Sequence, residues 1–193
     1  MVLAGGASTR MGADKAFLRL GEWTLVERCV ATLRQCFARN LVIANQPDRF
    51  ASLGLPVFPD EQPCLGPMGG LHAALRHAGT PALFVVACDM PFLNAELIRE
   101  MAQSLGDFDA VVPEIGGRFE PLHAVYHRRI LPVVEARIAA GDYALQALLR
   151  QLRLKTLSEE TRRRYARALV NVNTPEELEQ ARRRHGRQDT PAR

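Results

Sequence analysis

No stretch of the 193-residue sequence approaches the roughly 20 consecutive apolar residues that a membrane-spanning helix needs. The first residues also lack the basic segment followed by an apolar core that marks a secretory signal. These absences predict a cytoplasmic protein without a membrane partner. No internal repeat or low-complexity linker interrupts the chain, so we expect one domain over residues 1–185 and a flexible tail over residues 186–193.

Cysteine is scarce, with four residues in the whole chain, and no two of them form a C-x-x-C pair. No histidine stands near them at the spacing of zinc ligands. Cys29 and Cys36 are seven residues apart, which suits two small side chains on one face of a helix. We therefore predict four reduced thiols and no zinc site.

Aromatic residues make up only 6% of the chain, and the net charge of +4 is unevenly distributed. Residues 150–193 contain twelve Lys and Arg against six Asp and Glu, so the remainder, with thirteen against fifteen, is slightly acidic. The arginine runs 162–164 and 182–184 could attract an anion, but no aromatic residues alternate with them as base-stacking platforms would. This pattern favours solvated helix faces and disfavours nucleic acid as a partner.

Apolar runs of strand length alternate with amphipathic helical segments along the chain. The strand-like runs cover residues 1–4, 17–20, 41–45, 55–58, 82–87, 109–113 and 168–172. Helices are expected over residues 130–140 and 143–152, after the glycines at 66–70, and after caps at Thr24, Asn94, Asp142 and Thr174. The alternation predicts an α/β fold, a single Rossmann-like three-layer domain with a mostly parallel central sheet flanked by helices.

The first strand-like run leads directly into a glycine-rich loop over residues 5–15, which reads G-G-A-S-T-R-M-G-A-D-K. Glycine has no Cβ, so backbone N–H groups of such a loop can lie against a polyphosphate, while Arg10 and Lys15 neutralise its charge. Lys15 stands three residues after Gly12 and precedes alanine, so the loop is not a Walker motif. The spacing G-x-G-x-x-G of dinucleotide-binding folds is also absent.

A second glycine cluster, over residues 66–70, also stands where a strand leads into a helix. In a parallel sheet both loops lie at the carboxyl edge, so we expect them to enclose a nucleotide from two sides. Asp89 follows the apolar run 82–87, and a carboxylate at the tip of a buried strand needs a hydrogen bond, water or a metal. Because Asn94 already supplies the cap of the next helix, Asp89 is the best metal-ligand candidate.

Glu120 and His123 together suggest acid–base chemistry, but a structural interpretation is favoured. We expect Glu120 to bond the backbone or Arg118, and His123 to be a satisfied, partly buried histidine.

Read as L-A-G-G-x-S-x-R-M-G-x-D-K, residues 3–15 resemble the signature of molybdenum cofactor guanylyltransferases, which are nucleotidyltransferases that make molybdenum cofactor dinucleotides. Sugar-nucleotide and cytidylyl relatives carry looser versions, usually with Ala-Gly in place of Gly5-Gly6 and without the Asp-Lys pair. Further blocks resemble that family in the same order: Asp60 with 66–71, then 88–92, 120–126 and 171–178.

The resemblance implies transfer of GMP from GTP to the terminal phosphate of molybdenum-molybdopterin, with Mg²⁺ as cofactor. The products are the molybdopterin guanine dinucleotide cofactor and pyrophosphate, and molybdoenzyme maturation proteins are possible further partners. The residues implied are Leu3, Ala4, Gly5 and Gly6 against the nucleotide, Lys15 at its phosphates, Asn45, Asp60, Gly66 and Gly70 in the nucleotide pocket, Asp89 on the metal, and Asn171 and Asn173 toward the pterin. At Asn45 the register is open by a residue or two.

Attack of one phosphate on another brings anions together, so catalysis requires positioning and charge neutralisation and no nucleophilic side chain. We assign this role to Lys15, Arg10 and Asp89, with the two cations stabilising the departing pyrophosphate. Two alternatives stay open. One is a CTP-dependent molybdopterin cytidylyltransferase or another nucleotidyltransferase, and the other is a non-enzymatic molybdopterin carrier that uses the basic tail.

Overall fold

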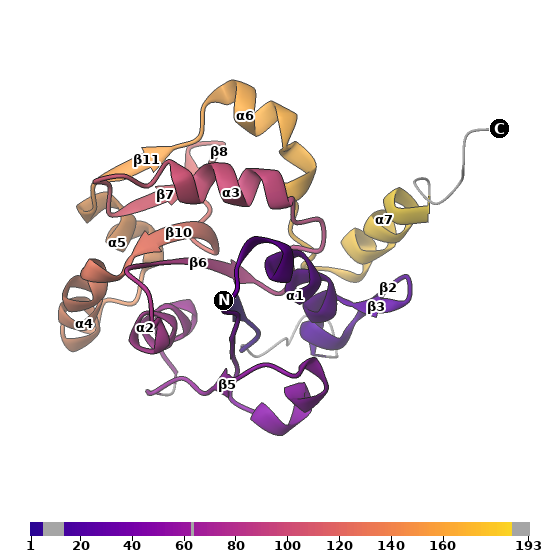
Figure 1. Cartoon of the computed structure of the whole chain (residues 1–193), viewed down its shortest axis with the longest axis horizontal. Coiled ribbons are helices and arrows are strands. Elements are labelled where there is room, and N and C mark those ends of the chain that lie inside the picture. The colour runs from indigo at the N-terminus through magenta and orange to yellow at the C-terminus, as the bar shows by residue number, and fades with distance from the viewer. Residues whose placement is uncertain (6–13, 63, 187–193) are drawn as a thin grey trace.

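The computed structural model describes residues 1–5, 14–62 and 64–186. Within these ranges, no helix is both long enough and apolar enough to cross a membrane. Seven strands of the described chain form one central sheet in the order β11-β7-β10-β6-β1-β4-β5 (Figure 1). Their bounds are β1 Val2–Leu3, β4 Val42–Ile43, β5 Val57–Phe58, β6 Ala82–Ala87, β7 Ala110–Val112, β10 His123–His127 and β11 Leu154–Thr156.

The central sheet is mostly parallel, as predicted. β1 pairs in parallel with β4 and β6, β4 with β5, and β11 with β7. β10 runs antiparallel between β6 and β7. Two short hairpins lie outside this sheet, formed by β2 Arg19–Leu20 with β3 Trp23–Thr24 and by β8 Glu114–Ile115 with β9 Arg118–Phe119.

Helices cover both faces of the sheet, which confirms the expected three layers (Figure 1). The strands alternate between the two faces, because successive side chains of a strand point to opposite sides. The helices are α1 Leu25–Cys36, α2 Pro67–His77, α3 Ala95–Gln103, α4 Leu131–Ala139, α5 Leu145–Gln151, α6 Glu159–Arg164 and α7 Pro175–Gly186. In β6, Phe84 and Val86 belong to the core cluster with α1 and α3, whereas Leu83 and Val85 belong to the cluster with α2, α4 and α5.

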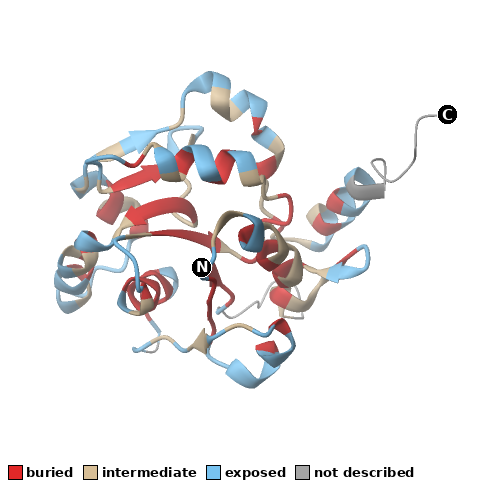
Figure 2. Cartoon of the chain, in the orientation of Figure 1, coloured by how far each residue is buried: buried red, intermediate tan, exposed pale blue. Residues whose placement is uncertain are grey.

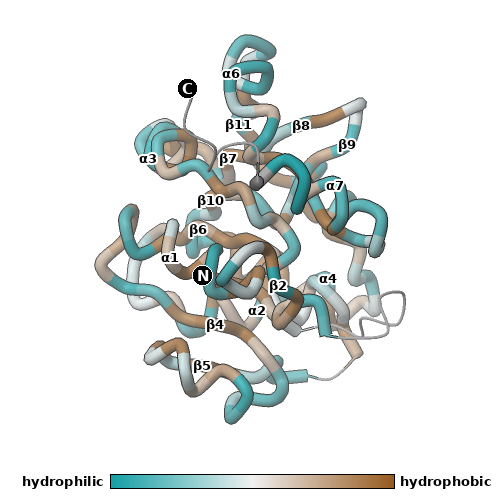
Figure 3. Tube along the Cα trace, turned by 90° about the vertical axis from the view of Figure 1, so that its right-hand side faces the viewer, coloured by the Kyte–Doolittle hydropathy of each residue, from teal (hydrophilic) through white to brown (hydrophobic). Residues whose placement is uncertain are grey.

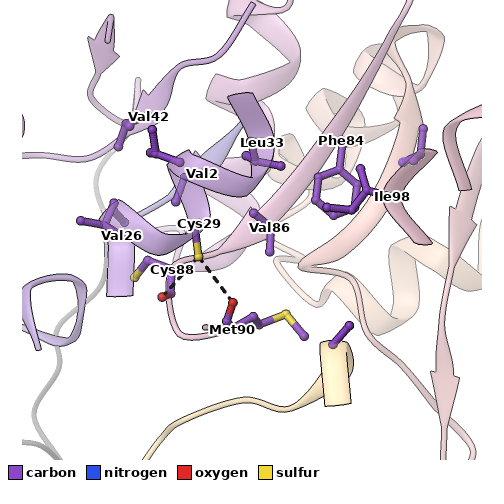
Figure 4. Close-up of a cluster of buried hydrophobic side chains, with 14 of the residues drawn as sticks. Val2, Val26, Cys29, Leu33, Val42, Phe84, Val86, Cys88, Met90 and Ile98 are labelled. Atoms are coloured by element: carbon purple, nitrogen blue, oxygen red, sulfur yellow. Dashed lines mark hydrogen bonds between the residues drawn. The ribbon is translucent and has the colours of Figure 1, made fainter. Parts of the chain in front are cut away.

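Burial follows these layers, with the strands β6 and β10 and the inner helix faces buried and the outer helix faces exposed (Figure 2). On the α1 face, Cys29 packs against the sheet and its thiol donates to the carbonyls of Cys88 and Met90 (Figure 4). All four cysteines are free, as predicted. Burial raises the pKa of the Cys29 thiol to about 12, so it stays protonated at neutral pH.

Three of the predicted helix caps are confirmed. The Thr24 hydroxyl accepts from the Glu27 amide, and the Glu27 carboxylate accepts from the Thr24 amide at 2.7 Å. Asn94 caps α3 through the amide of Leu97 at 2.9 Å, and Thr174 forms a second reciprocal box with Glu177 at the start of α7.

The predicted cap at Asp142 is wrong. α5 begins after Ala144, whose amide donates to Asp142 Oδ1 at 3.1 Å, so Asp142 closes the preceding turn instead of the helix. Its other oxygen pairs with Arg137.

Other boundaries predicted from the sequence are also wrong. Residues 168–172 form no strand, because their first part is the 3-10 turn η4 Ala166–Leu169. An apolar run of strand length signals burial, and Ala168 and Leu169 are buried without strand pairing. Residues 17–20 contain the end of the 3-10 turn η1 Lys15–Phe17 as well as β2. The edge strand β11 was missed because its side chains are half-buried or exposed.

The expectations for His123 and Glu120 need correction. His123 is fully buried, its ring meets Phe84 edge-on with centroids 5.2 Å apart, and neither ring nitrogen has a hydrogen-bond partner within the described residues. Burial lowers the pKa of His123 to about 3. Within the described chain, the Glu120 carboxylate bonds neither backbone nor Arg118 and instead accepts from Asn171 Nδ2 at 3.1 Å.

His123 should make the fold sensitive to acid. Its pKa in the folded protein lies below the usual 6.5, so its contribution to stability is present above pH 6.5 and is lost as the pH falls toward 3. Between about pH 7 and pH 5, the free energy of unfolding of the native protein should fall by about 2 kcal/mol more than that of His123→Phe. Urea denaturation at both pH values measures the difference, and an equal fall in the two proteins would contradict the prediction.

Candidate active site

A cavity of about 230 Å³ lies at the carboxyl ends of β1, β4 and β6. Its walls come from both glycine-containing segments: residues 3–5 with Asp14 and Lys15, and Gly66, Pro67 and Gly70 at the start of α2. Asp60 and residues 87–89 complete them. The expected convergence of the two loops is therefore confirmed for their described parts. Gly6 and Arg10, two of the predicted site residues, lie outside the described residues.

Lys15 is held at the edge of this cavity by the turn η1. The Asp14 carboxylate accepts from the Ala16 amide at 3.1 Å, and Ala16 is fully buried, so the turn is fixed to the core. Lys15 Nζ donates to Asn173 Oδ1 at 2.7 Å and lies 3.4 Å from Asp89 Oδ2. The structure thus brings together three predicted site residues that are far apart in the sequence.

Asp89 presents a carboxylate suited to a cation. It follows β6, its side chain is 19% exposed, and its Oδ1 atom is buried without a hydrogen-bond partner in the described part of the chain. Burial raises the pKa of Asp89 above its usual value, although the Lys15 ammonium opposes the shift. A buried carboxylate oxygen without a donor is costly, and a divalent cation would satisfy it.

The donor set around Asp89 is small. No group of three or more His, Cys, Asp or Glu side chains that could hold a metal occurs among the described residues. A cation at Asp89 would therefore depend on ligands from the substrate. Mg²⁺ sites of this kind are common, because the ion retains waters and binds one or two carboxylates together with substrate phosphates.

Asn45 and Asp60 form a reciprocal pair beside the cavity. Asn45 Nδ2 donates to Asp60 Oδ2 at 3.1 Å, and the Asp60 amide donates to Asn45 Oδ1 at 2.9 Å. The two residues follow β4 and β5, which are neighbours in the sheet, so the pair connects two strand ends. Asp60 lines the cavity, and Asn45 is connected to it through Asp60.

The second glycine segment needs glycine for two different reasons. At Gly70, an added Cβ would lie 3.0 Å from Leu3 Cδ1, so its absence allows α2 to approach β1 closely. At Gly66, φ is +57° and ψ is −141°, a backbone conformation that L-residues rarely adopt. Gly66 thereby lets the chain turn sharply into α2, whose first turn faces the cavity.

Gly66→Ala should lower the free energy of unfolding by about 2–3 kcal/mol through backbone strain alone. Gly54→Ala is the matched control, because Gly54 also has a positive φ of +60° and open space around the added Cβ. Its ψ of +35° lies in the left-handed helical region, where alanine costs about 1 kcal/mol. Urea denaturation of both variants compares the two positions, and a cost at Gly66 no larger than at Gly54 would refute the explanation.

The two asparagines predicted for the pterin side form hydrogen bonds with different partners. Asn173 accepts from Lys15, whereas Asn171 donates to Glu120. Burial raises the pKa of Glu120, the hydrogen bond from Asn171 opposes the shift, and the negative charge of Asp89 adds to it. The sequence favours a structural role for Glu120, yet the negative charge of Asp89 acts on its carboxyl group. In the sequence, only its position in the family-like block 120–126 indicated that Glu120 could belong to the site.

Asp14 was also missed. It lines the cavity, caps η1 and accepts from Arg49 Nη1 at 2.7 Å, while the Arg49 guanidinium lies 4.3 Å from the ring centroid of Phe17. Both residues of the D-K pair thus line the cavity, and Asp14 also orients the turn that carries Lys15. Only the lysine could be assigned from charge.

Known proteins are similar to this chain in sequence and in fold. The model of the MobA-like NTP transferase domain matches residues 1–157. A probable molybdenum cofactor guanylyltransferase of Carboxydothermus hydrogenoformans is 38% identical over 183 residues, covering 92% of this chain and 91% of the relative. A molybdenum cofactor guanylyltransferase of Desulfosudis oleivorans is 37% identical over 186 residues, covering 94% of this chain and 92% of the relative.

The fold agrees with a solved structure. The crystal structure of molybdopterin-guanine dinucleotide biosynthesis protein A from Archaeoglobus fulgidus superposes with a TM-score of 0.82 and 26% identity, covering 96% of this chain and 97% of the other. The chain therefore belongs to the MobA-like NTP transferase family and is a nucleotidyltransferase.

Proposed function

We propose that the protein transfers GMP from GTP to the terminal phosphate of molybdenum-molybdopterin, which yields molybdopterin guanine dinucleotide cofactor and pyrophosphate. The observation that carries the proposal is the position of Lys15 and Asp89, 3.4 Å apart in a cavity walled by both glycine segments. The names of the relatives support guanine over cytosine, and the share of each relative that the chain covers supports one nucleotidyltransferase domain over residues 1–185.

α7, which lies beyond the part matched by the family model, belongs to this proposed domain. Its Leu178 and Ala181 share a small core cluster with Leu20, Phe92 and Val172. Removing α7 would expose this cluster and unseat Asn173, which directly precedes the helix cap.

The proposed nucleotide site follows the walls of the cavity. The end of β1, with Leu3, Ala4 and Gly5, would contact the nucleotide together with Gly6, while Asp60, Gly66 and Gly70 would form the opposite wall and Asn45 would hold Asp60. Lys15 would bind the phosphates. The start of α2 adds a favourable field, because the N-terminus of a helix attracts phosphate.

Enzymes of this family generally use a divalent metal ion, and we propose Mg²⁺ held by Asp89. The unpartnered Oδ1 atom of Asp89 supports this assignment. When bound, Mg²⁺ supplies positive charge to the phosphate oxygens of the nucleotide.

In the proposed reaction, a terminal phosphate oxygen of the pterin substrate bonds to the α-phosphorus of GTP, and the bond between the α- and β-phosphates breaks. The attacking phosphate is already ionised at neutral pH, so no side chain has to remove a proton. Lys15 stabilises the negative charge on the departing pyrophosphate, with Arg10 as a second proposed cation.

Asn171 and Asn173 would face the pterin. Because Asn173 already accepts from Lys15, the lysine joins the proposed nucleotide and pterin sides of the reaction centre.

The test measures pyrophosphate release from GTP, CTP and ATP with Mg²⁺ and molybdenum-molybdopterin. Preferred use of GTP is expected. A strong preference for CTP would instead identify a cytidylyltransferase, and binding of the pterin without pyrophosphate release would identify a carrier. Proteins of molybdoenzyme maturation are proposed as further partners that receive the product.

A further inference from the structure

A larger hollow, of about 1040 Å³, lies apart from the proposed reaction centre. It is a groove between α1, the turn of the β2–β3 hairpin, the segment 91–94, the end of α6 with η4, and α7. Figure 1 shows α7 projecting from the body of the molecule, with α6 above it and the β2–β3 hairpin below. The arginine runs of the sequence lie on α6 and α7, whose residues are largely hydrophilic (Figure 3).

The groove is strongly basic. Its described lining contains the arginines 28, 164, 167 and 182 and a single carboxylate, that of Glu22. These arginines come from four elements, and the fold brings Arg28 and Arg182 to the neighbouring pair Arg164 and Arg167. A concave surface with this excess of positive charge attracts and orients an anionic partner.

Two of the arginines support the walls. Arg28 Nε donates to the carbonyl of Pro91 at 3.3 Å, and Arg182 Nη2 donates to the carbonyl of Arg19 at 3.2 Å. These bonds fix the segment 91–94 and the hairpin against α1 and α7. The walls of the groove are therefore held in place by charged side chains that bond backbone carbonyls.

The other two arginines are presented on aromatic rings. The guanidinium of Arg167 lies 4.4 Å from the ring centroid of Phe92, and that of Arg164 lies 5.1 Å from the ring centroid of Tyr165. Neither forms an ion pair with a carboxylate of the described residues. Stacking restricts a guanidinium and leaves its donor edge available, which suits bidentate binding of carboxylates.

The groove also offers apolar surface. Its lining includes Ala31, Pro91 and Leu93, and the Trp23 side chain at its rim is 48% exposed. A bare phosphate chain would gain little from these contacts. Base stacking along a strand would need several free rings, but Trp23 is the one exposed ring of the described lining, since those of Phe92 and Tyr165 are buried beneath guanidinium groups. The combination favours a peptide that carries both carboxylates and apolar side chains.

We propose that this groove docks an acidic, apolar-containing segment of another protein. A short segment of chain connects the groove to the reaction centre, because Pro91 and Phe92 of the lining follow Asp89 by two and three residues. The carbonyl of Asp89 also accepts from the Val172 amide at 2.8 Å, which ties the segments on both sides of the groove together. The docking surface does not depend on which nucleotide the protein uses.

The experiment selects short random peptides from a display library by their binding to the full chain. Peptides that also bind the double variant Arg164→Gln/Arg167→Gln are removed. The strongest peptide is then titrated while tryptophan emission is recorded, since Trp23 is the single tryptophan of the chain and lines the groove. We expect enriched peptides to combine Asp or Glu with apolar residues, and their binding to change the emission. The double variant should bind them about tenfold more weakly or worse.

The matched control is Arg150→Gln/Lys155→Gln, which removes the same charge from exposed positions on α5 and β11 and should keep full affinity. Arg164→Gln alone repeats the measurement if the double variant is unstable, because this side chain is exposed. Enrichment without acidic residues, unchanged tryptophan emission, equal loss in the control, or displacement of the peptide by a single-stranded oligonucleotide would each overturn the proposal.

Discussion

Lys15→Ala is expected to lower the rate of pyrophosphate release by about 100-fold or more while the protein stays folded. Lys15 is the only cation among the described residues that line the cavity. Negative charge grows on the departing pyrophosphate, and a preorganised ammonium stabilises this charge more in the transition state than in the bound substrate. Steady-state turnover at saturating GTP isolates this effect from weaker nucleotide binding.

The chain contains one other lysine, Lys155, which makes a matched control. Lys155 is exposed on the edge strand β11, with its ammonium 6.0 Å from the ring centroid of Phe108. Lys155→Ala removes the same charge and should leave turnover unchanged. Near-normal turnover of Lys15→Ala, or an equal loss in the control, would remove Lys15 from the proposed mechanism.

The sequence predicted those parts of the fold that depend on strong local signals. The six apolar residues 82–87 form β6 with the predicted bounds, and the reciprocal boxes at Thr24 and Thr174 begin helices. A helix cap depends on residues three positions apart, and a buried central strand depends on one continuous apolar run, so both can be recognised from neighbouring residues. The antiparallel direction of β10 had no such signal, since strand direction depends on pairing with β6 and β7.

The site was predictable where a motif fixes both the residue and its place on a strand end. Lys15 and Asp89 met this condition, and the structure brings them to one cavity. The contacts of Asn173 with Lys15 and of Asn171 with Glu120 could not be foreseen, because each joins residues at least 51 positions apart. The basic groove was not predictable for the same reason, because Arg28 and Arg182 meet Arg164 and Arg167 only in the folded chain.

Asp89→Asn is expected to lower turnover by about 100-fold or more and, at neutral pH, to raise the free energy of unfolding. Turnover falls because the substitution removes the proposed ligand of Mg²⁺. The free energy of unfolding rises because the native carboxylate is buried, and this burial raises the pKa of Asp89 above its usual value. A carboxyl with a raised pKa stabilises the fold only at low pH, and this contribution is lost as the pH rises through the pKa of the folded state. Asparagine is neutral at every pH and does not lose this contribution. The difference in stability between Asp89→Asn and the native protein should therefore shrink in acid.

Asp109→Asn is the matched control, because Asp109 shows the opposite behaviour. Burial acts to raise the pKa of Asp109, but hydrogen bonds from the Arg153 amide at 2.9 Å and from Arg129 Nε at 2.8 Å lower it overall. The same substitution should therefore reduce stability at neutral pH and leave turnover intact. Urea denaturation and pyrophosphate release on both variants separate the two roles. A destabilised Asp89→Asn with normal turnover would show that this carboxylate supports the fold and not the reaction.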